Sequence, residues 1–189
     1  MKFLAAVFFL VALTSNALAL SDSELAAKSR GITLYNQLKA STAHPLLKIA
    51  AEAGDHEAQF FLAEEIRQKK QNIDSEAYKW YEAAANQGDL YSMIRIGRSN
   101  NNLCAAMKNC PTGTKEPQQW LAEANKIAKQ KSDRGDAEAQ YLMYELTAER
   151  DWLKKSALAG HPTAQYRMAI GDRQGEGFIL PWKRQEIVE

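Results

Sequence analysis

Histidine and cysteine, the residues that most often hold metals and carry nucleophilic catalysis, are scarce in this sequence. It has three histidines (His44, His56 and His161) and two cysteines. No two histidines are four residues apart, so the sequence has no helical zinc pair. It also lacks the Gly-x-Ser-x-Gly nucleophile elbow and the glycine-rich phosphate loop that ends in Gly-Lys-Ser or Gly-Lys-Thr. We therefore expect no metal, no cofactor and no enzyme activity.

An excess of charge of one sign is missing as well. The 24 lysines and arginines nearly balance the 23 acidic residues, which leaves a formal net charge of +1. Such a chain has no strong field to concentrate nucleic acid or anionic lipid, so neither is an expected partner. Beyond the N-terminus no run is long and apolar enough to span a bilayer, and we expect no stable membrane insertion.

The N-terminus has the layout of a secretory signal peptide. Lys2 precedes an apolar run of eleven residues at 3–13, and Ala17-Leu18-Ala19 forms a small-x-small cleavage signal. The run is shorter than the roughly 20 residues that a spanning helix needs. We predict that residues 1–19 are removed and that the mature chain lies in the periplasm; a buried N-terminal helix is the alternative.

The two cysteines, Cys104 and Cys110, lie close together in the chain. In an oxidising compartment such a pair is most simply a local disulfide, with free thiols as the alternative. No histidine lies nearby to complete a metal site.

Four segments of the chain repeat one pattern around a column of glycines. The column glycines are Gly54, Gly88, Gly135 and Gly160, with gaps of 34, 47 and 25 residues. A mean period of about 35 residues is typical of solenoids built from helical hairpins. Glycine commonly ends a helix, and the Asp55, Asp89 and Asp136 that follow are good caps for the next one. Each copy is therefore predicted to fold as a helix, a tight turn and a second helix.

Two sets of positions within the copies are predicted to be buried. In the helix after each glycine, small and aliphatic residues recur four apart and should face a neighbouring helix. These core positions are Ala58 and Leu62, Ser92 and Ile96, Ala139 and Met143, and Ala164 and Met168. The tryptophans Trp80, Trp120 and Trp152 are expected to form a packed seam, although each has a ligand-stacking role as an alternative.

The strongest copy, GDHEAQFFLAEEIRQKKQNIDSEAYKWYEAAANQGD at residues 54–89, resembles the Sel1-like repeat of the tetratricopeptide-like families. The resemblance covers residues 43–178 and implies an all-α, right-handed superhelical solenoid of antiparallel helix pairs. The second copy departs from the pattern at Ser92 and Met93 and carries an insertion at about 99–117, which holds both cysteines. The third has almost no loop, and the fourth stops after its first helix.

Two segments flank the repeats. Residues 20–42 are predicted to form an N-terminal capping helix, begun by a capping box from Ser21 to Glu24. Residues 179–189 form a C-terminal tail that either packs over the last hairpin or binds a partner.

A variable column between the core positions is the predicted partner-binding surface. It holds Phe61, Arg95, Leu142 and Arg167, and one helical turn further come Glu65 and Ser99. Arginine and large apolar residues are the types that anchor protein interfaces. Simple burial of Phe61 and Leu142 is the alternative. The insertion is a second candidate surface, since long loops in compact domains are often functional.

The resemblance implies a role in binding other proteins. Similar small periplasmic proteins include immunity-type inhibitors that neutralise toxic effectors, notably lipases, delivered by contact-dependent machines such as the type VI secretion system. Others are scaffolds or regulatory adaptors in envelope complexes. A single domain with an idiosyncratic insertion and a neutral charge favours the inhibitor, and the envelope scaffold is the alternative.

The disulfide prediction can be checked directly on the exported protein. If Cys104 and Cys110 are bonded, the unreduced protein unfolded in urea should not react with a thiol reagent, and reduction should expose two thiols per chain. Closing so small a ring should contribute on the order of 2 kcal/mol to stability. Two reactive thiols before reduction would contradict the prediction.

Overall fold

The computed structural model describes residues 19–99, 107 and 115–173. These residues form nine α-helices and no strand, which confirms the predicted all-α class. The helices are α1 (Asp22–Asn36), α2 (Ala40–Glu52), α3 (His56–Lys70), α4 (Ser75–Asn86), α5 (Leu90–Gly97), α7 (Pro117–Ser132), α8 (Ala137–Thr147), α9 (Arg150–Leu158) and α10 (Pro162–Arg173). The predicted signal peptide up to residue 18, both cysteines and the tail 179–189 lie outside the described residues.

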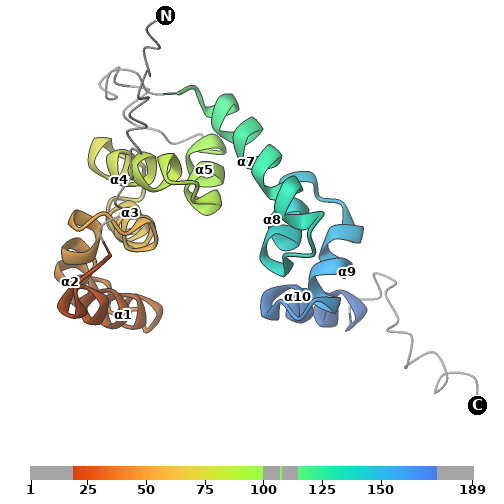
Figure 1. The fold of residues 1–189 in the computed structure, drawn as a ribbon, viewed down its shortest axis with the longest axis horizontal. Helices are drawn as coiled ribbons and strands as arrows, with labels where there is room; N and C mark the ends of the chain where they lie inside the picture. The colour runs from red at the N-terminus through yellow and green to blue at the C-terminus, as the bar shows by residue number, and fades with distance from the viewer. Residues whose placement is uncertain (1–18, 100–106, 108–114, 174–189) are drawn as a thin grey trace, which may run out of the picture.

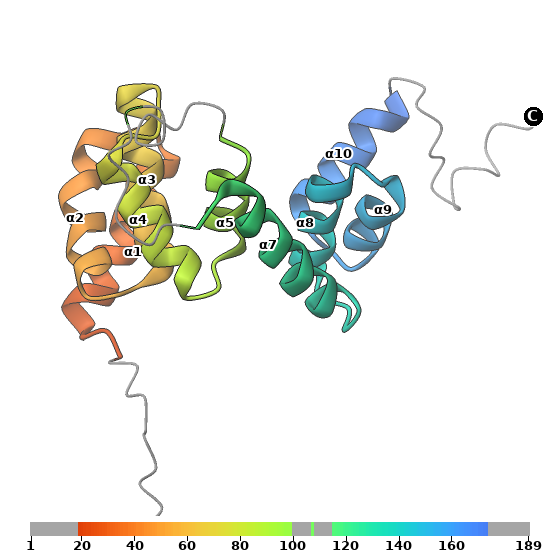
Figure 2. The same ribbon diagram turned by 90° about the horizontal axis from the view of Figure 1, so that it is seen from above.

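The helices form a solenoid in which each packs mainly against its neighbours in the chain (Figures 1 and 2). Helices α1 to α5 make a first stack. Helix α7 packs against α5 and leads to α8, α9 and α10, which with it make a second stack. Helix α10 is the last helix of the described residues, which end at Arg173, so the predicted truncation of the fourth copy falls outside them.

The predicted glycine turns are present in all four copies. The column glycines have φ angles of 87° to 96°, a left-handed conformation that costs little only for glycine. Asp55, Asp89 and Asp136 each accept a hydrogen bond at 2.7–2.8 Å from the backbone N–H three residues on. In the fourth copy His161 takes this role, because its Nδ1 accepts from the N–H of Ala164 at 3.2 Å.

A glutamine in three of the copies closes the turn from the other side. Each donates from its side-chain amide to a backbone carbonyl eight residues earlier, at the end of the preceding helix. The pairs are Gln59 to Ala51 at 3.1 Å, Gln140 to Ser132 at 3.3 Å and Gln165 to Ala157 at 3.2 Å. The second copy has Met93 at this position, and its side chain is buried instead. Each of these carbonyls also accepts from the N–H of the column glycine at 3.0–3.1 Å, so the glutamine adds a second hydrogen bond at the end of the helix.

The predicted core positions are all buried. Alanines in this core allow neighbouring helices to approach closely, and Trp120 packs among them. All three tryptophans of the predicted seam pack against this core, but of the three only Trp120 is fully buried. Trp80 and Trp152 are half-buried, and the ammonium groups of Lys79 and Lys155 lie 5.1 Å and 4.4 Å from their ring centres.

The N-terminal region differs from the predicted capping helix at 20–42. Helix α1 begins with the expected capping box at Ser21 and Glu24 but ends at Asn36. Leu38 is left-handed (φ 61°), and α2 runs back from Ala40. The turn lets α2 pack on α1, where Leu47 lies against Gly31 so closely that a Cβ there would be 3.0 Å from its side chain. The capping helix is therefore shorter than predicted, and the next helix begins at Ala40 instead of after residue 42.

The insertion lies between helices that touch each other. Helix α5 ends at Gly97 and α7 begins at Pro117. A Cβ added to Gly97 would lie 2.6 Å from Cγ of Leu121, so α5 and α7 approach at a point where only glycine fits. The two stacks are thus joined by direct helix packing.

The glutamine role predicts a graded effect on stability. Gln140 is buried and Gln165 is exposed, so water cannot replace the hydrogen bond lost in Gln140→Ala but can replace the one lost in Gln165→Ala. We expect Gln140→Ala to lower the free energy of unfolding by about 1–2 kcal/mol and Gln165→Ala by less than half of that. Urea unfolding followed by circular dichroism measures both. Equal losses would show that the carbonyl bond is not what the glutamine contributes.

Candidate functional site

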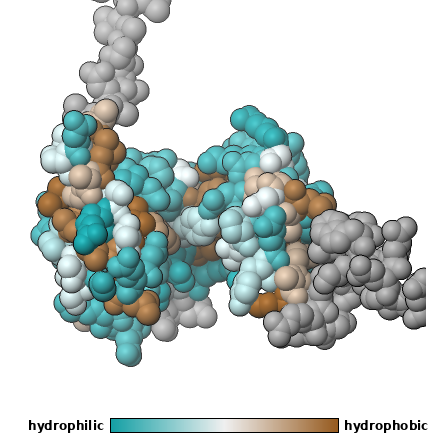
Figure 3. Space-filling model, turned by 90° about the horizontal axis from the view of Figure 1, so that it is seen from below, coloured by the Kyte–Doolittle hydropathy of each residue, from teal (hydrophilic) through white to brown (hydrophobic). Residues whose placement is uncertain are grey.

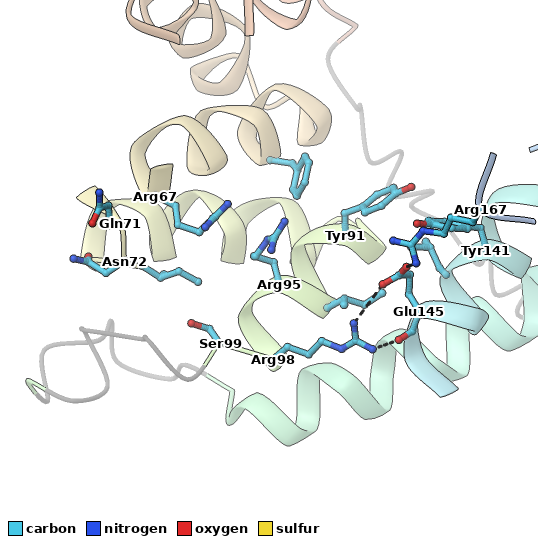
Figure 4. A pocket seen from close by; sticks show the side chains of 14 residues that line it. Arg67, Gln71, Asn72, Tyr91, Arg95, Arg98, Ser99, Tyr141, Glu145 and Arg167 are labelled. Carbon is cyan, nitrogen blue, oxygen red and sulfur yellow. Dashed lines mark hydrogen bonds and ion pairs between the residues drawn. The ribbon is translucent and has the colours of Figure 1, made fainter. Parts of the chain in front are cut away.

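A cleft of about 590 Å³ lies between the two stacks (Figure 4). Its walls come from α3, α5, α8 and α10, which are the first helices of the four repeat copies, together with the turn after α3 and the residues that follow α5. The side chains that define its chemistry are Arg67, Arg95, Arg98, Arg167, Glu145, Phe60, Tyr91 and Tyr141.

Four of the six predicted partner-binding residues line this cleft. Arg95 and Ser99 lie on the first stack, and Leu142 and Arg167 lie on the second. Leu142 lines it from a buried position, with 2 % of its surface exposed, while Arg95 and Arg167 are exposed.

The other two predicted residues, Phe61 and Glu65, face away from the cleft. Phe61 packs edge-on against Tyr35 of α1, with ring centres 5.2 Å apart. The Glu65 side chain is 2 % exposed, and its Oε2 lies 2.6 Å from Nδ1 of His44 on α2. Contacts with the preceding helix pair therefore hold these two side chains.

The sequence prediction missed a second charged column. This column lies ten residues after the column glycine and holds Glu64, Arg98 and Glu145. It is one position before the column of the predicted partner-binding residues Glu65 and Ser99. The rotation of the helices brings this column toward the cleft. A glutamate ten residues after the glycine in two copies, with arginine in a third, was the available signal.

A buried carboxylate organises the arginines of the first stack. The Glu64 side chain is 5 % exposed and has three donors around it. Arg67 Nη2 lies at 2.7 Å, Arg95 Nε at 2.5 Å and the Tyr81 hydroxyl donates at 2.7 Å. Burial first, and then the Glu64 charge, raise the pKa of Tyr81. Burial works against the charge of Arg67, but its hydrogen bond to Glu64, the charge of Glu64 and the contacts with Tyr81 together outweigh this and raise the pKa of Arg67.

A second carboxylate, Glu145 on α8, connects arginines of both stacks (Figure 4). Its Oε1 lies 2.8 Å from Arg167 Nη1, and its Oε2 lies 3.7 Å from Arg98 Nη1. Arg98 also donates to the backbone carbonyl of Glu145. The Arg167 guanidinium lies 5.4 Å from the ring centre of Tyr141. Burial, and then hydrogen bonding to Glu145, raise the pKa of Tyr141 to about 12.

One further hydrogen bond crosses between the stacks. The Tyr91 hydroxyl on α5 donates to Glu138 on α8 at 2.5 Å. Burial and this bond raise the pKa of Tyr91. Together with the Arg98 contacts it ties the two walls of the cleft.

The cleft has more positive than negative charge. Its four arginines are paired with two carboxylates, Glu64 and Glu145, which leaves a surplus of two positive charges. Each guanidinium has five N–H donors, and Nε of Arg67 is buried without a hydrogen-bond partner. With Phe60, Tyr91 and Tyr141 alongside, the cleft is suited to an anionic ligand that also carries apolar groups.

Other features of the described residues do not point to a rival site. No group of three or more His, Cys, Asp or Glu among them is arranged to hold a metal ion. Exposed large hydrophobic side chains are spread over α1, α2, α5, α9 and α10 as well as two connecting segments, and the face in Figure 3 mixes hydrophilic and hydrophobic residues.

A helix that spans a membrane must be both long and apolar. Within the described part of the chain, no helix combines the length and the hydropathy that crossing a bilayer requires.

Comparison with known proteins gives similarity of fold. No protein-family model and no curated protein matches the chain. A solved structure of c5321, a protective antigen of uropathogenic Escherichia coli strains with an SLR fold, is similar at 20 % identity and a TM-score of 0.45, over 80 % of this chain and 34 % of that one. A Sel1 repeat protein from Oxalobacter formigenes is similar at 23 % identity and a TM-score of 0.39, over 75 % of this chain and 73 % of that one. This chain thus spans about a third of the E. coli protein.

The buried carboxylate predicts a large stability effect. Glu64→Ala leaves Arg67, Arg95 and Tyr81 without their acceptor, and we expect it to lower the free energy of unfolding by about 3 kcal/mol. Glu52→Ala is the matched control. Its carboxylate is exposed and lies 3.8 Å from Lys48, so a change within about 0.5 kcal/mol is expected. Urea unfolding compares the two, and similar losses would contradict the role given to Glu64.

Proposed function

We propose that this chain is a protein-binding module that holds one partner protein in the cleft between its two stacks. The observation that carries the proposal is the composition of the cleft, where arginines and tyrosines from all four repeat copies converge. These residue types dominate the binding energy of protein interfaces. The inner wall of stacked helical hairpins is also the usual docking surface of such folds.

The cleft favours binding over catalysis. Its two associated carboxylates, Glu64 and Glu145, are each held by two arginines. A carboxylate whose oxygens are already occupied by two guanidinium groups is poorly placed to exchange a proton with a substrate as a general acid or base.

The particular role we propose is that of an immunity-type inhibitor, which occupies and neutralises a toxic secreted effector such as a lipase of a type VI secretion system. One cleft with charges at fixed positions is suited to one dedicated partner, whereas a scaffold needs an extended wall for several. The leader-like residues 1–19 support the periplasm as the place of binding.

The test begins with the mature chain, residues 20–189, used to capture proteins from the envelope fraction of its host. The captured protein is then purified, and its affinity is measured for wild type and for the Arg95→Glu, Arg167→Glu double variant. We expect one stoichiometric partner and at least about a hundredfold weaker binding by the double variant, because interface arginines are common hot spots.

Arg30→Glu, an exposed charge reversal on α1 outside the cleft, is the control and should bind as wild type does. Thermal unfolding checks that each variant is folded. Recovery of several envelope-complex subunits would favour the scaffold. Undiminished binding by the folded double variant would show that the cleft is not the docking site.

A further inference from the structure

The two carboxylates associated with the cleft occupy different environments. Glu64 is nearly enclosed, and its three donors lie at 2.5–2.7 Å. Glu145 is 26 % exposed, and its partners Arg98 and Arg167 are 43 % and 44 % exposed. Ion pairs this exposed contribute little to stability, so they exchange readily for other pairs. Glu64 is therefore structural, whereas Glu145 can be replaced.

From this difference we infer that the cleft recognises an acidic segment of the partner and that Glu145 is an internal substitute for it. In the free protein Glu145 holds Arg98 and Arg167. On binding, a carboxylate of the partner takes its place between these arginines. The inference rests on the proposed function and names the chemistry of the partner.

The charge of the cleft supports an acidic occupant. Four arginines against two carboxylates leave two positive charges to be balanced. Replacing the contacts of Glu145 with those of a partner carboxylate retains every favourable pairing of the arginines. A basic segment would instead add to the existing surplus, which disfavours it.

The position of Arg167 also supports this exchange. Its guanidinium lies over the rings of Tyr141 and Tyr144, at 5.4 Å and 5.7 Å from their centres. These contacts hold the side chain without help from Glu145. A planar guanidinium held in this way is ready for two parallel hydrogen bonds to an incoming carboxylate.

The cleft's size and lining favour a peptide over a small anion. About 590 Å³ is far more than one inorganic anion fills, and Phe60, Tyr91 and Tyr141 offer apolar surface beside the arginines. An acidic segment with apolar or aromatic neighbours fits both features. A polyphosphate chain has no apolar groups and would gain little from the aromatic side chains.

The experiment selects peptides from a random twelve-residue display library on the immobilised mature chain, with elution by the partner protein or by high salt. The best peptide is synthesised, as is a version in which Asn and Gln replace its Asp and Glu. Fluorescence anisotropy then measures both peptides against wild type, Glu145→Gln, Arg167→Gln and Glu138→Gln.

We expect the selected peptides to be enriched in Asp and Glu. Glu145→Gln should bind the acidic peptide about fivefold more tightly, because the competing carboxylate is gone. Arg167→Gln should bind it about tenfold more weakly, and the neutral peptide should lose most of its affinity. Raising the salt concentration should weaken the acidic peptide, as screening requires.

The Glu138→Gln variant distinguishes two possible causes of tighter peptide binding: removal of the competing Glu145 carboxylate, and a looser contact between the two stacks. Glu138 also connects α5 and α8, through Tyr91, but is not paired with Arg98 or Arg167 in the cleft. If Glu138→Gln tightens binding as much as Glu145→Gln, the gain comes from a looser cleft and the inference is overturned. Unchanged or weaker binding by Glu145→Gln overturns it as well.

The outcomes distinguish this inference from the proposed function. Peptides that require Arg167 but show no acidic preference would overturn the inference and leave the binding function in place. If every selected peptide binds the Arg95→Glu, Arg167→Glu variant as it binds wild type, both fail together.

Discussion

The left-handed glycine turn is the constraint on which the rest of this fold depends. At each column glycine one helix ends, and an aspartate or a histidine caps the next helix immediately afterwards. Because the turn has the same conformation in every copy, the following helices start in the same register. Position seven after the glycine in the second, third and fourth copies therefore faces the cleft, as does position ten in the second and third copies.

The same repeat position has a different role in two copies, because the helices around it differ. Glu64 and Glu145 occupy the same place in their copies. Helix α3 lies inside the first stack, where Tyr81 of α4 covers Glu64. Helix α8 borders the open space between stacks, so Glu145 keeps part of its surface in solvent. One repeat position thus supplies both a fixed structural anion and an accessible one.

Local signals in the sequence predicted the helices and turns well. They could not predict how each whole helix is rotated about its axis. The glycine column, the aspartate caps and the core positions depend on neighbours within about one turn, and all of these were predicted correctly. Whether position ten or eleven faces the cleft depends on packing against another helix pair, such as the contact of His44 with Glu65. The break between α1 and α2 was predicted a few residues too late, at 42–43, because no glycine or proline marks its true place; the left-handed residue there is Leu38.

The contact at Gly97 affects where the sequence of this protein can change in length without disturbing the cleft. Because α5 and α7 pack directly against each other there, the two ends of the insertion are held together by the helices. The closure entropy of a loop between fixed ends grows slowly, by only about 0.6 kcal/mol for each doubling of its length. The segment between these helices can therefore be lengthened, shortened or exchanged at small cost while the cleft keeps its geometry, which makes it a natural place for sequence change.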